Sequence, residues 1–441
     1  MPSPDKPREQ AVDILRQAEA GIFADTLLDR ARPFFDQRDN AFILELVYGV
    51  LRNREKLDWL LDRFSKEPVA STDDWTRNIL RLGAYQLLFL DKVPASAAVN
   101  TSTELAKTHG KKSGYVNGLL RNLERKKNAI PPLKLDDPVK QLAILHSHPE
   151  WLVRRWVGRF GAERTARALE ENNRPAPLVV RTNATRTTRE KLLGSLKADG
   201  ADAKETAYSA VGIELVSSPG LTTLSAFRDG WFMVQDEAAQ LVATMLAPKP
   251  GETVLDACAA PGGKATHLAE MMGNSGQVVA LEGDKKRIPR IRENAARLGL
   301  TIIKPVLGDA ALYKEGAYDK VLVDAPCSGL GVLRRHPDGR WTKTVKTIKE
   351  KQVIQKKVLA NCAALVNPGG VLVYATCTTE PEENENVVND FLAKHPEFSL
   401  DDPRQYLPAS ASKLNDVQGF FRTFPNATEM DGFFGARMRR K

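Results

Sequence analysis

The sequence has few cysteines, few histidines and no long apolar run, and each shortage excludes a class of protein. Its 441 residues hold four cysteines and six histidines, too few for a disulfide framework in a chain of this length. Neither C-x-x-C nor H-E-x-x-H is present, so we expect reduced thiols and no metal site. No run approaches the ~18 apolar residues of a transmembrane helix, and the first residues lack the apolar core of a secretory signal. We therefore expect a cytoplasmic monomer that does not bind membranes.

Positive charge is in modest excess. The chain carries 64 Lys and Arg against 55 Asp and Glu, a formal net charge of +9. The excess gathers at residues 107–127 and 154–191. Such stretches fit either a solvated helix face or a surface for a polyanion, and charge alone does not choose between them.

The length predicts two to three domains, and the spacing of apolar residues suggests where they lie. Residues 1–130 have apolar positions three and four apart, which predicts an all-α bundle. Residues 131–230 combine a helix near 150–171 with short strands such as 177–183, a small α+β module. In residues 231–441, short β-branched runs alternate with helices, which predicts an α/β Rossmann-like domain with a parallel sheet.

The strands of this last domain can be placed individually. The predicted strands are 253–255, 277–281, 302–306, 320–323 and 371–375, and the predicted helices include 284–298 and 349–366. The run Asn367-Pro-Gly-Gly is expected to stop the second of these helices. Since the carboxyl ends of parallel strands meet at one edge of a sheet, the loops after these strands should lie together.

The loop after the first of these strands is rich in small residues. It reads Cys258, Ala259, Ala260, Pro261, Gly262, Gly263 and Lys264, and a helix follows. Small residues let a ligand approach the backbone, and the N-terminus of the helix presents free N–H groups. The G-x-G-x-x-G spacing of a nicotinamide site is absent. The proline makes a stiffer turn, better suited to an amino-acid carboxylate than to a pyrophosphate.

Acidic residues follow the next three strands. Glu282 ends the second strand, where a carboxylate can accept both hydroxyls of a ribose. Asp309 follows the third strand and can accept the exocyclic amine of adenine, and Asp324 ends the fourth. Together with the small-residue loop, these acids predict a pocket for an adenosine that carries an amino acid, namely S-adenosylmethionine.

Two cysteines suggest the reaction. Cys327 and Cys377 follow the fourth and fifth strands, so both should face the ligand. Carbon 5 of cytosine is a poor nucleophile, but addition of a thiolate to carbon 6 makes an enamine whose carbon 5 can attack a methyl group. An acid at ring nitrogen 3 favours that addition, and Asp324 can supply it when protonated. The residues leave open which cysteine attacks; Cys258 and Cys362 are expected to be small buried hydrophobes.

These motifs resemble those of the Sun (Fmu) family of RNA cytosine-5 methyltransferases. The matching runs are D-A-C-A-A-P-G-G-K (256–264), D-A-P-C-S-G (324–329), A-T-C-T (375–378), V-Q-D-E-A-A-Q (234–240) and D-G-F-F-G-A-R (431–437). The first part of the chain is similar to the NusB-like RNA-binding domain of bacterial members, in residues 38–52, 80–87 and 116–122. Between them, only Arg181-Thr-Asn looks like the family.

The resemblance implies roles that the residues alone leave open. It implies that Cys377 attacks the base and that Cys327 assists its release. It implies S-adenosylmethionine contacts at Cys258–Lys264, Glu282, Arg287, Asp309 and Asp324. Many relatives have Asp where this chain has Glu282, which affects the ribose geometry only. The NusB-like part implies ribosomal RNA as the partner, free or in a partly assembled small subunit.

Three other functions compete with this interpretation. A transfer RNA methyltransferase would carry the same catalytic motifs, and only the NusB-like part favours ribosomal RNA. A non-catalytic RNA-binding assembly factor would not need Cys327, Cys377 and Asp324, which are all intact. A nicotinamide dehydrogenase is disfavoured by the missing G-x-G-x-x-G spacing.

Overall fold

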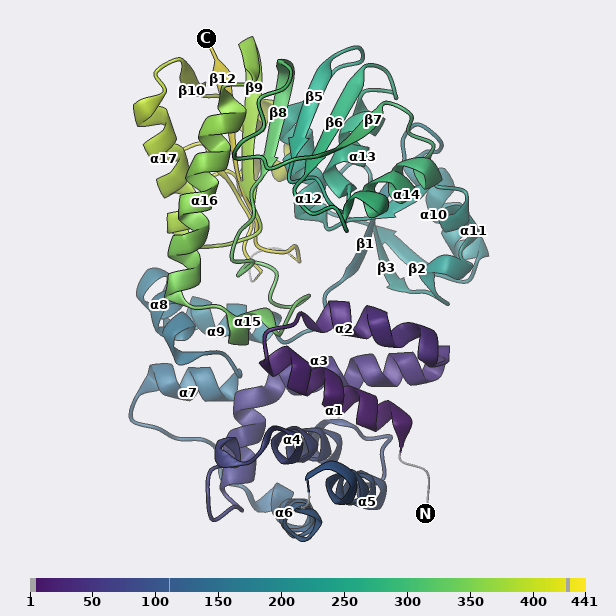
Figure 1. Cartoon of the computed structure of the whole chain (residues 1–441), viewed down its shortest axis with the longest axis vertical. Coiled ribbons are helices and arrows are strands. Elements are labelled where there is room, and N and C mark those ends of the chain that lie inside the picture. The colour runs from purple at the N-terminus through teal and green to yellow at the C-terminus, as the bar shows by residue number, and fades with distance from the viewer. Residues whose placement is uncertain (1–4, 111, 426–428) are drawn as a thin grey trace. The chain divides into compact units, whose positions relative to one another are not determined.

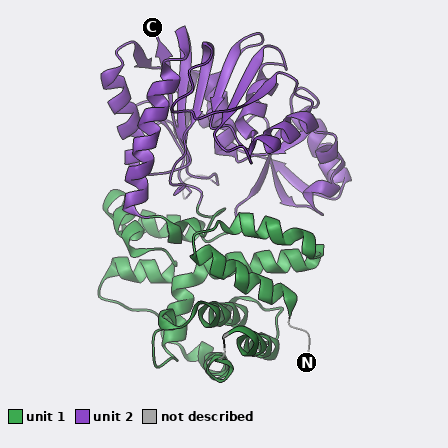
Figure 2. Ribbon diagram, in the orientation of Figure 1, with its two compact units in different colours: residues 1–175, 333–343 green, residues 176–332, 344–441 purple. Residues whose placement is uncertain are grey.

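The computed structural model describes residues 5–110, 112–425 and 429–441 and divides into two compact units (Figures 1 and 2). The first, which we call the helical unit, comprises residues up to 175 together with 333–343. The second, the sheet unit, comprises 176–332 and 344–441. Within the described residues, no helix is long and apolar enough to cross a membrane.

The helical unit contains only helices and turns among its described residues, which confirms the all-α prediction for its first 130 residues. Its α-helices are α1 (Lys6–Glu19), α2 (Ala24–Ala31), α3 (Gln37–Asp62), α4 (Asp74–Phe89), α5 (Ala95–Leu105), α6 (Ser113–Lys126), α7 (Pro138–Leu145), α8 (Glu150–Phe160), α9 (Ala162–Glu171) and α15 (Gly339–Thr342). Asp36 and Asp73 cap α3 and α4 by accepting backbone N–H groups of the first turn. One helix was predicted near 150–171, but Gly161 at φ +78° separates α8 from α9.

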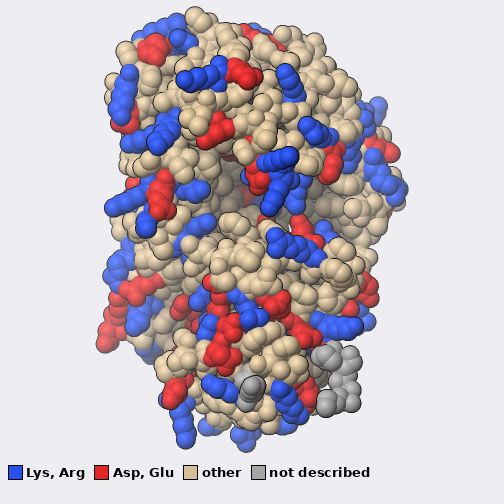
Figure 3. Space-filling view, in the orientation of Figure 1, with Lys and Arg blue, Asp and Glu red and all other residues tan. Residues whose placement is uncertain are grey.

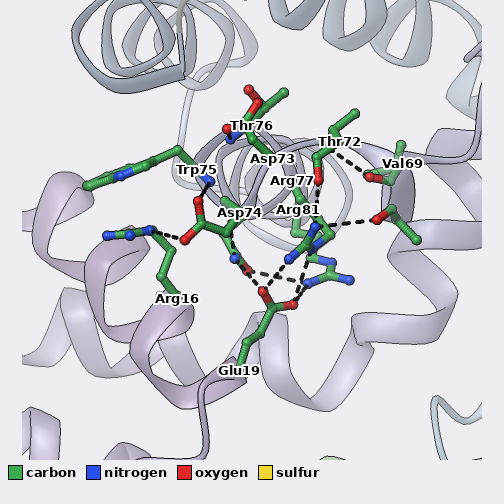
Figure 4. A network of polar contacts seen from close by, with 12 residues as sticks. Arg16, Glu19, Val69, Thr72, Asp73, Asp74, Trp75, Thr76, Arg77 and Arg81 are labelled. Carbon is green, nitrogen blue, oxygen red and sulfur yellow. Dashed lines mark hydrogen bonds and ion pairs between the residues drawn. The ribbon is translucent and has the colours of Figure 1, made fainter.

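A network of ion pairs around the buried Arg81 joins three helices of this unit (Figure 4). Arg81 of α4 makes two hydrogen bonds to the carboxylate of Asp58 in α3, at 2.6 and 2.7 Å, and an ion pair with Glu19 at the end of α1. Arg77 adds a second cation to Glu19, at 2.9 Å. Burial opposes ionisation of Glu19, but its bonds with Arg77 and Arg81 outweigh that effect and lower its pKa to about 2.

The sheet unit begins with a small antiparallel sheet in the order β2-β3-β1-β4. Its elements are β1 (Leu178–Thr182), α10 (Arg189–Ala198), β2 (Asp202–Glu205), β3 (Gly212–Ser217), α11 (Ser225–Arg228) and β4 (Phe232–Val234). Arg181 of β1 is fully buried and pairs with Glu270 at 2.7 Å. Its guanidinium also donates to the carbonyl oxygen of Gly263 at 2.7 Å. Arg181 therefore fixes the start of the helix that follows the small-residue loop.

The large sheet has the order β10-β12-β9-β8-β5-β6-β7, with β11 paired to β12. Its elements are α12 (Glu237–Leu246), β5 (Thr253–Ala257), α13 (Gly263–Met271), β6 (Gln277–Glu282), α14 (Ile288–Leu298), β7 (Ile303–Leu307), β8 (Tyr318–Asp324), α16 (Val345–Ala363), β9 (Val366–Thr376), α17 (Glu385–Lys394), β10 (Phe398–Leu400), β11 (Phe421–Arg422) and β12 (Phe434–Arg440). Strands β5 to β9 are parallel. The order reverses between β5 and β8, which is the switch point where open α/β sheets bind ligands.

Alternate residues of the central strands enter two different cores. Val254 and Val278 pack with residues of α12, α13 and α14. Their neighbours Leu255 and Val279 pack instead with residues of α16 and α17. Because successive side chains of a strand point to opposite faces, this division confirms the predicted sheet with helices on both sides.

Two predictions need revision. The helix predicted at 349–366 is α16, which ends at Ala363, and Asn367-Pro-Gly-Gly lies inside β9 instead of stopping the helix. Gly369 takes φ +75° there, near the point where the pairing of β8 with β9 shifts register.

The domain boundaries at 130 and 230 stay a prediction. The two compact units divide after residue 175, so α7 to α9 lie in the helical unit.

Candidate active site

The small-residue loop lies at the switch point, between the end of β5 and the start of α13. Gly262 takes φ +99°, a conformation that favours glycine, and Cys258 takes φ +63° although it carries a side chain. Cys258 is half-buried, and burial and the charge of Asp324 raise the pKa of its thiol. The first turn of α13 presents backbone N–H groups that have no acceptor within the helix. The loop thus offers donors for an anionic group.

Glu282 lies at the end of β6, next to this loop. Its buried carboxylate accepts hydrogen bonds from the backbone N–H groups of Ala260, at 3.1 Å, and of Asp284, at 2.9 Å. Arg287 lies 3.7 Å from the same carboxylate. A carboxylate can accept about four hydrogen bonds, so Glu282 retains capacity for hydroxyl groups of a ligand.

Asp309 lies in the exposed loop after β7. Its side chain accepts the backbone N–H of Ala311 at 2.9 Å and so caps its own loop. The backbone N–H of the preceding residue, Gly308, donates to the backbone oxygen of Glu282 at 3.0 Å. The structure therefore brings the loops that carry Glu282 and Asp309 together at adjacent strand ends.

Asp324 and Lys264, both predicted site residues, form an ion pair. The Lys264 ammonium nitrogen lies 2.6 Å from Asp324 Oδ2. Burial disfavours the ammonium form, but Asp324, with smaller contributions from Asp256 and Cys377, outweighs burial and raises the pKa of Lys264. The pair therefore places a retained proton beside the thiols.

The two predicted catalytic cysteines meet at the ends of β8 and β9. Their sulfur atoms lie 3.1 Å apart, and both thiols are free. The hydrogen bond with Cys377, together with burial and the charge of Glu383, raises the pKa of Cys327 well above its usual range. The fourth cysteine, Cys362, is buried in α16 as predicted, and burial raises its pKa to about 12.

The sequence analysis missed polar residues beneath the site. Asp256 of β5 is fully buried, and neither oxygen has a hydrogen bond of normal geometry within the described part of the chain. Burial and the charge of Asp324 raise its pKa to about 8. A charged residue inside the otherwise apolar strand 253–257 was the available signal. Glu383 and Asn384 were also missed, although the polar run Pro381-Glu-Glu-Asn-Glu-Asn follows the second cysteine motif closely.

Several basic residues of the two stretches form ion pairs with acidic neighbours. Arg154, Arg167 and Arg174 each pair with a glutamate one turn away, and Lys107 pairs with Glu104. The face in Figure 3 shows Lys and Arg interleaved with Asp and Glu. Charge therefore does not single out one RNA-binding surface.

The site fits S-adenosylmethionine. A buried carboxylate with free acceptor capacity, a helix N-terminus and a small-residue loop converge at the switch point of a parallel sheet. Together with the strand order, these features define an S-adenosylmethionine-dependent methyltransferase.

Comparison with known families is more specific, because the model described as "16S rRNA methyltransferase RsmB/F" matches residues 243–439. The NusB family matches 5–125, and the RsmF/B-like ferredoxin-like domain matches 148–221.

Whole-chain relatives agree with these matches. The chain is 37% identical to "Probable ribosomal RNA small subunit methyltransferase B" of Bacillus subtilis, over 92% of this chain and 91% of that protein. It is 34% identical to ribosomal RNA small subunit methyltransferase B of Salmonella agona, with the same coverage. The solved structure of PH0851 covers 100% of both chains with a TM-score of 0.82 and 28% identity. The chain belongs to the RsmB/F methyltransferase family.

Proposed function

We propose that this protein transfers a methyl group from S-adenosylmethionine to carbon 5 of a cytidine in small-subunit ribosomal RNA. A covalent bond between Cys377 and the base would activate the ring. The observation that carries the proposal is the pair of free thiols, 3.1 Å apart, at the ends of β8 and β9. The ion pair of Asp324 with Lys264 supplies an adjacent proton. Cys258–Lys264, Glu282, Arg287, Asp309 and Asp324 would hold the cofactor.

The first step is attack on the base. Cys377 Sγ forms a bond to carbon 6, and the electrons of the C5=C6 bond make carbon 5 nucleophilic as nitrogen 3 takes a proton. That proton comes from Lys264, whose ammonium group the ion pair with Asp324 keeps protonated until addition of the thiolate makes nitrogen 3 basic enough to accept it. S-adenosylmethionine supplies the methyl group that carbon 5 accepts.

The second step is release. The proton on carbon 5 leaves to water, its bonding electrons re-form the C5=C6 bond, and the S–C6 bond breaks with its electron pair returning to Cys377. Nitrogen 3 returns its proton to the Lys264–Asp324 pair, which restores the neutral base. The Cys327 thiol, whose pKa is raised, keeps its proton and donates it in a hydrogen bond to the departing sulfur. The raised pKa of Cys327 supports this cysteine as the thiol that assists release, which leaves Cys377 as the nucleophile.

The ribosomal substrate rests on the family and its helical part. The relatives are named as small-subunit ribosomal RNA methyltransferases, and residues 5–125 match the NusB family. A cytosine must leave its stack to reach a thiol, which costs on the order of a few kcal/mol and least in loops or unfolded RNA. We therefore expect faster methylation of free ribosomal RNA or a partly assembled particle than of the mature subunit.

The decisive experiment follows the covalent bond. RNA that contains 5-fluorocytidine cannot lose its carbon-5 substituent as a proton, so with S-adenosylmethionine it should remain attached to Cys377 in mass spectrometry. Cys377→Ala should abolish methylation, and Cys327→Ala should accumulate an adduct with normal RNA. Bisulfite sequencing of ribosomal and transfer RNA, with and without the gene, identifies the substrate. An active Cys377→Ala variant, or no trapped adduct, would contradict the mechanism.

A further inference from the structure

Two consecutive buried residues hold the loops of both cysteines. Glu383 ends the short turn Pro381–Glu383, and Asn384 precedes α17. Glu383 is completely buried and Asn384 is 1% exposed. Neither residue lies in the proposed cofactor loop, and neither is a cysteine. Asn384 contacts the residues on both sides of Cys377, and Glu383 contacts those on both sides of Cys327, one of them through Gln355.

Glu383 acts on the Cys327 side. Its carboxylate accepts the backbone N–H of Ser328 at 2.8 Å and also the Ser328 hydroxyl. The amide of Gln355, in α16, donates to Glu383 at 3.0 Å and to the backbone oxygen of Pro326 at 3.1 Å. Pro326 and Ser328 flank Cys327, so Glu383 and Gln355 fix the backbone on both sides of this thiol.

Asn384 acts on the Cys377 side. Its side-chain oxygen accepts the Thr376 hydroxyl, and its side-chain nitrogen donates to the backbone oxygen of Thr378 at 2.9 Å. Thr376 and Thr378 flank Cys377. The hydroxyl oxygens of Ser328 and Thr378 lie 2.9 Å apart, so the two sets of contacts are joined beneath the sulfur atoms.

Burying a carboxylate to hold these loops costs desolvation free energy, which stability alone would not require. A buried carboxylate that receives hydrogen bonds from an amide, a hydroxyl and a side-chain amide still loses much of its hydration. Burial accordingly raises the pKa of Glu383. The negative charge nearby also opposes ionisation of Cys327. The carboxylate of Glu383 thus acts on Cys327 electrostatically as well as geometrically.

We propose that Glu383 and Asn384 are positioning residues with separate duties: Asn384 aligns Cys377 for attack on the base, and Glu383 aligns Cys327, as a thiol, for release. The inference rests on the proposed covalent function. Both residues act through the cysteine loops and not on the base itself. Because the residues are adjacent, one short segment sets the distance between the two sulfur atoms.

The proposal predicts opposite defects from neighbouring substitutions. Glu383→Gln removes the negative charge and places a donor amide opposite the Ser328 hydroxyl, which can then no longer donate to residue 383. We expect it to slow turnover about tenfold and to raise the steady-state fraction of covalent enzyme–RNA adduct several-fold, as Cys327→Ala does. Asn384→Ala should instead slow adduct formation about tenfold without accumulating adduct. Both quantities can be measured with an unmodified ribosomal RNA fragment and S-adenosylmethionine, by denaturing gel and single-turnover kinetics.

A matched control is the next residue along the chain. Glu385 pairs with Arg422 at 3.2 Å, away from the contacts above, so Glu385→Gln should leave turnover and adduct level unchanged. If Glu383→Gln does not fold, Gln355→Met tests the same tether, because it removes the donor to Pro326, and it should also accumulate adduct.

The outcomes separate this inference from the proposed function. If Glu383→Gln and Asn384→Ala slow both steps equally, the residues serve only packing and the inference is overturned. The same holds if Gln355→Met, or a folded Glu383→Gln, accumulates no more adduct than the wild type. If instead the wild type retains no 5-fluorocytidine RNA and Cys327→Ala traps no normal RNA, the covalent function fails with it.

Discussion

The charge network around Arg81 in the helical unit and the acid beneath the cofactor loop in the sheet unit differ in the direction of their pKa shifts. In the helical unit, Arg81 meets Asp58 and Glu19, and the pKa of Glu19 falls to about 2. In the sheet unit, Asp256 has no hydrogen bond of normal geometry within the described residues, and its pKa rises to about 8. Matched charges contribute to a defined structure, whereas acids forced toward neutrality mark places where chemistry is performed. The contrast therefore distinguishes a scaffold from a site.

The difference follows the role of the residue and not the unit as a whole. Arg181 and Glu270 lie in the sheet unit and form a buried pair of the structural kind, at 2.7 Å. That pair supports the first turn of α13 from below, through the carbonyl of Gly263. By contrast, Asp256 and Glu383, whose pKa values are raised by burial, lie within a few residues of the proposed cofactor loop or of Cys377.

The largest effect should come from breaking the matched network. Arg81→Met leaves Glu19 and Asp58 without their shared cation, and loss of one partner from a buried ion pair costs about 3–5 kcal/mol. Urea unfolding should show that loss, while binding of S-adenosylmethionine to the folded protein stays within about twofold. Arg16→Met, which removes a more exposed ion pair with Asp74, should cost less than about 1 kcal/mol. Equal costs for the two variants would contradict the distinction.

Removing a charge from the proposed active site should reduce the rate of methyl transfer strongly and change the stability of the protein little. Lys264→Met removes the proton donor paired with Asp324, so we expect methyl transfer to slow about 100-fold, a typical loss for one electrostatic group. The melting temperature should change by no more than a few degrees. Single-turnover transfer of labelled methyl groups measures the rate, and Lys304→Met, at an exposed position of β7, is the control. A rate within threefold of wild type would remove Lys264 from the proposed mechanism.

The sequence allowed much of this arrangement to be predicted, but not its buried contacts. Short β-branched runs that alternate with helices predicted the parallel sheet, and the order of the motifs predicted that Cys327 and Cys377 meet, because the carboxyl ends of parallel strands lie at one edge. Partners distant in sequence, such as Gln355 with Glu383, depend on how α16 packs. The ion pair of Arg81 with Glu19 could not be predicted either, because the amphipathic pattern of α1 and α4 indicates which helix faces are apolar but not which charged residues meet.

Acid should weaken the matched network selectively. The pKa of Glu19 is lowered from 4.5 to about 2, so its ionised form contributes stability above about pH 4.5, and that contribution is lost as the pH falls toward 2. Glu19→Gln should therefore destabilise the protein by about 2 kcal/mol at pH 7 and by much less at pH 2.5. Urea midpoints at the two values test this, and a pH-independent difference would show that Glu19 acts through packing alone.

The smallest effect should have the opposite sign. The pKa of Asp256 is raised from 3.8 to about 8, so keeping it protonated in the folded state costs free energy that grows from about pH 4 to pH 8. Asp256→Asn removes that cost and should stabilise the protein by about 1 kcal/mol at pH 8.5, with little change at pH 4. Calorimetric melting at both values measures the difference. If the variant is instead destabilised most at high pH, Asp256 is a matched charge like Glu19, and the two units do not differ as argued above.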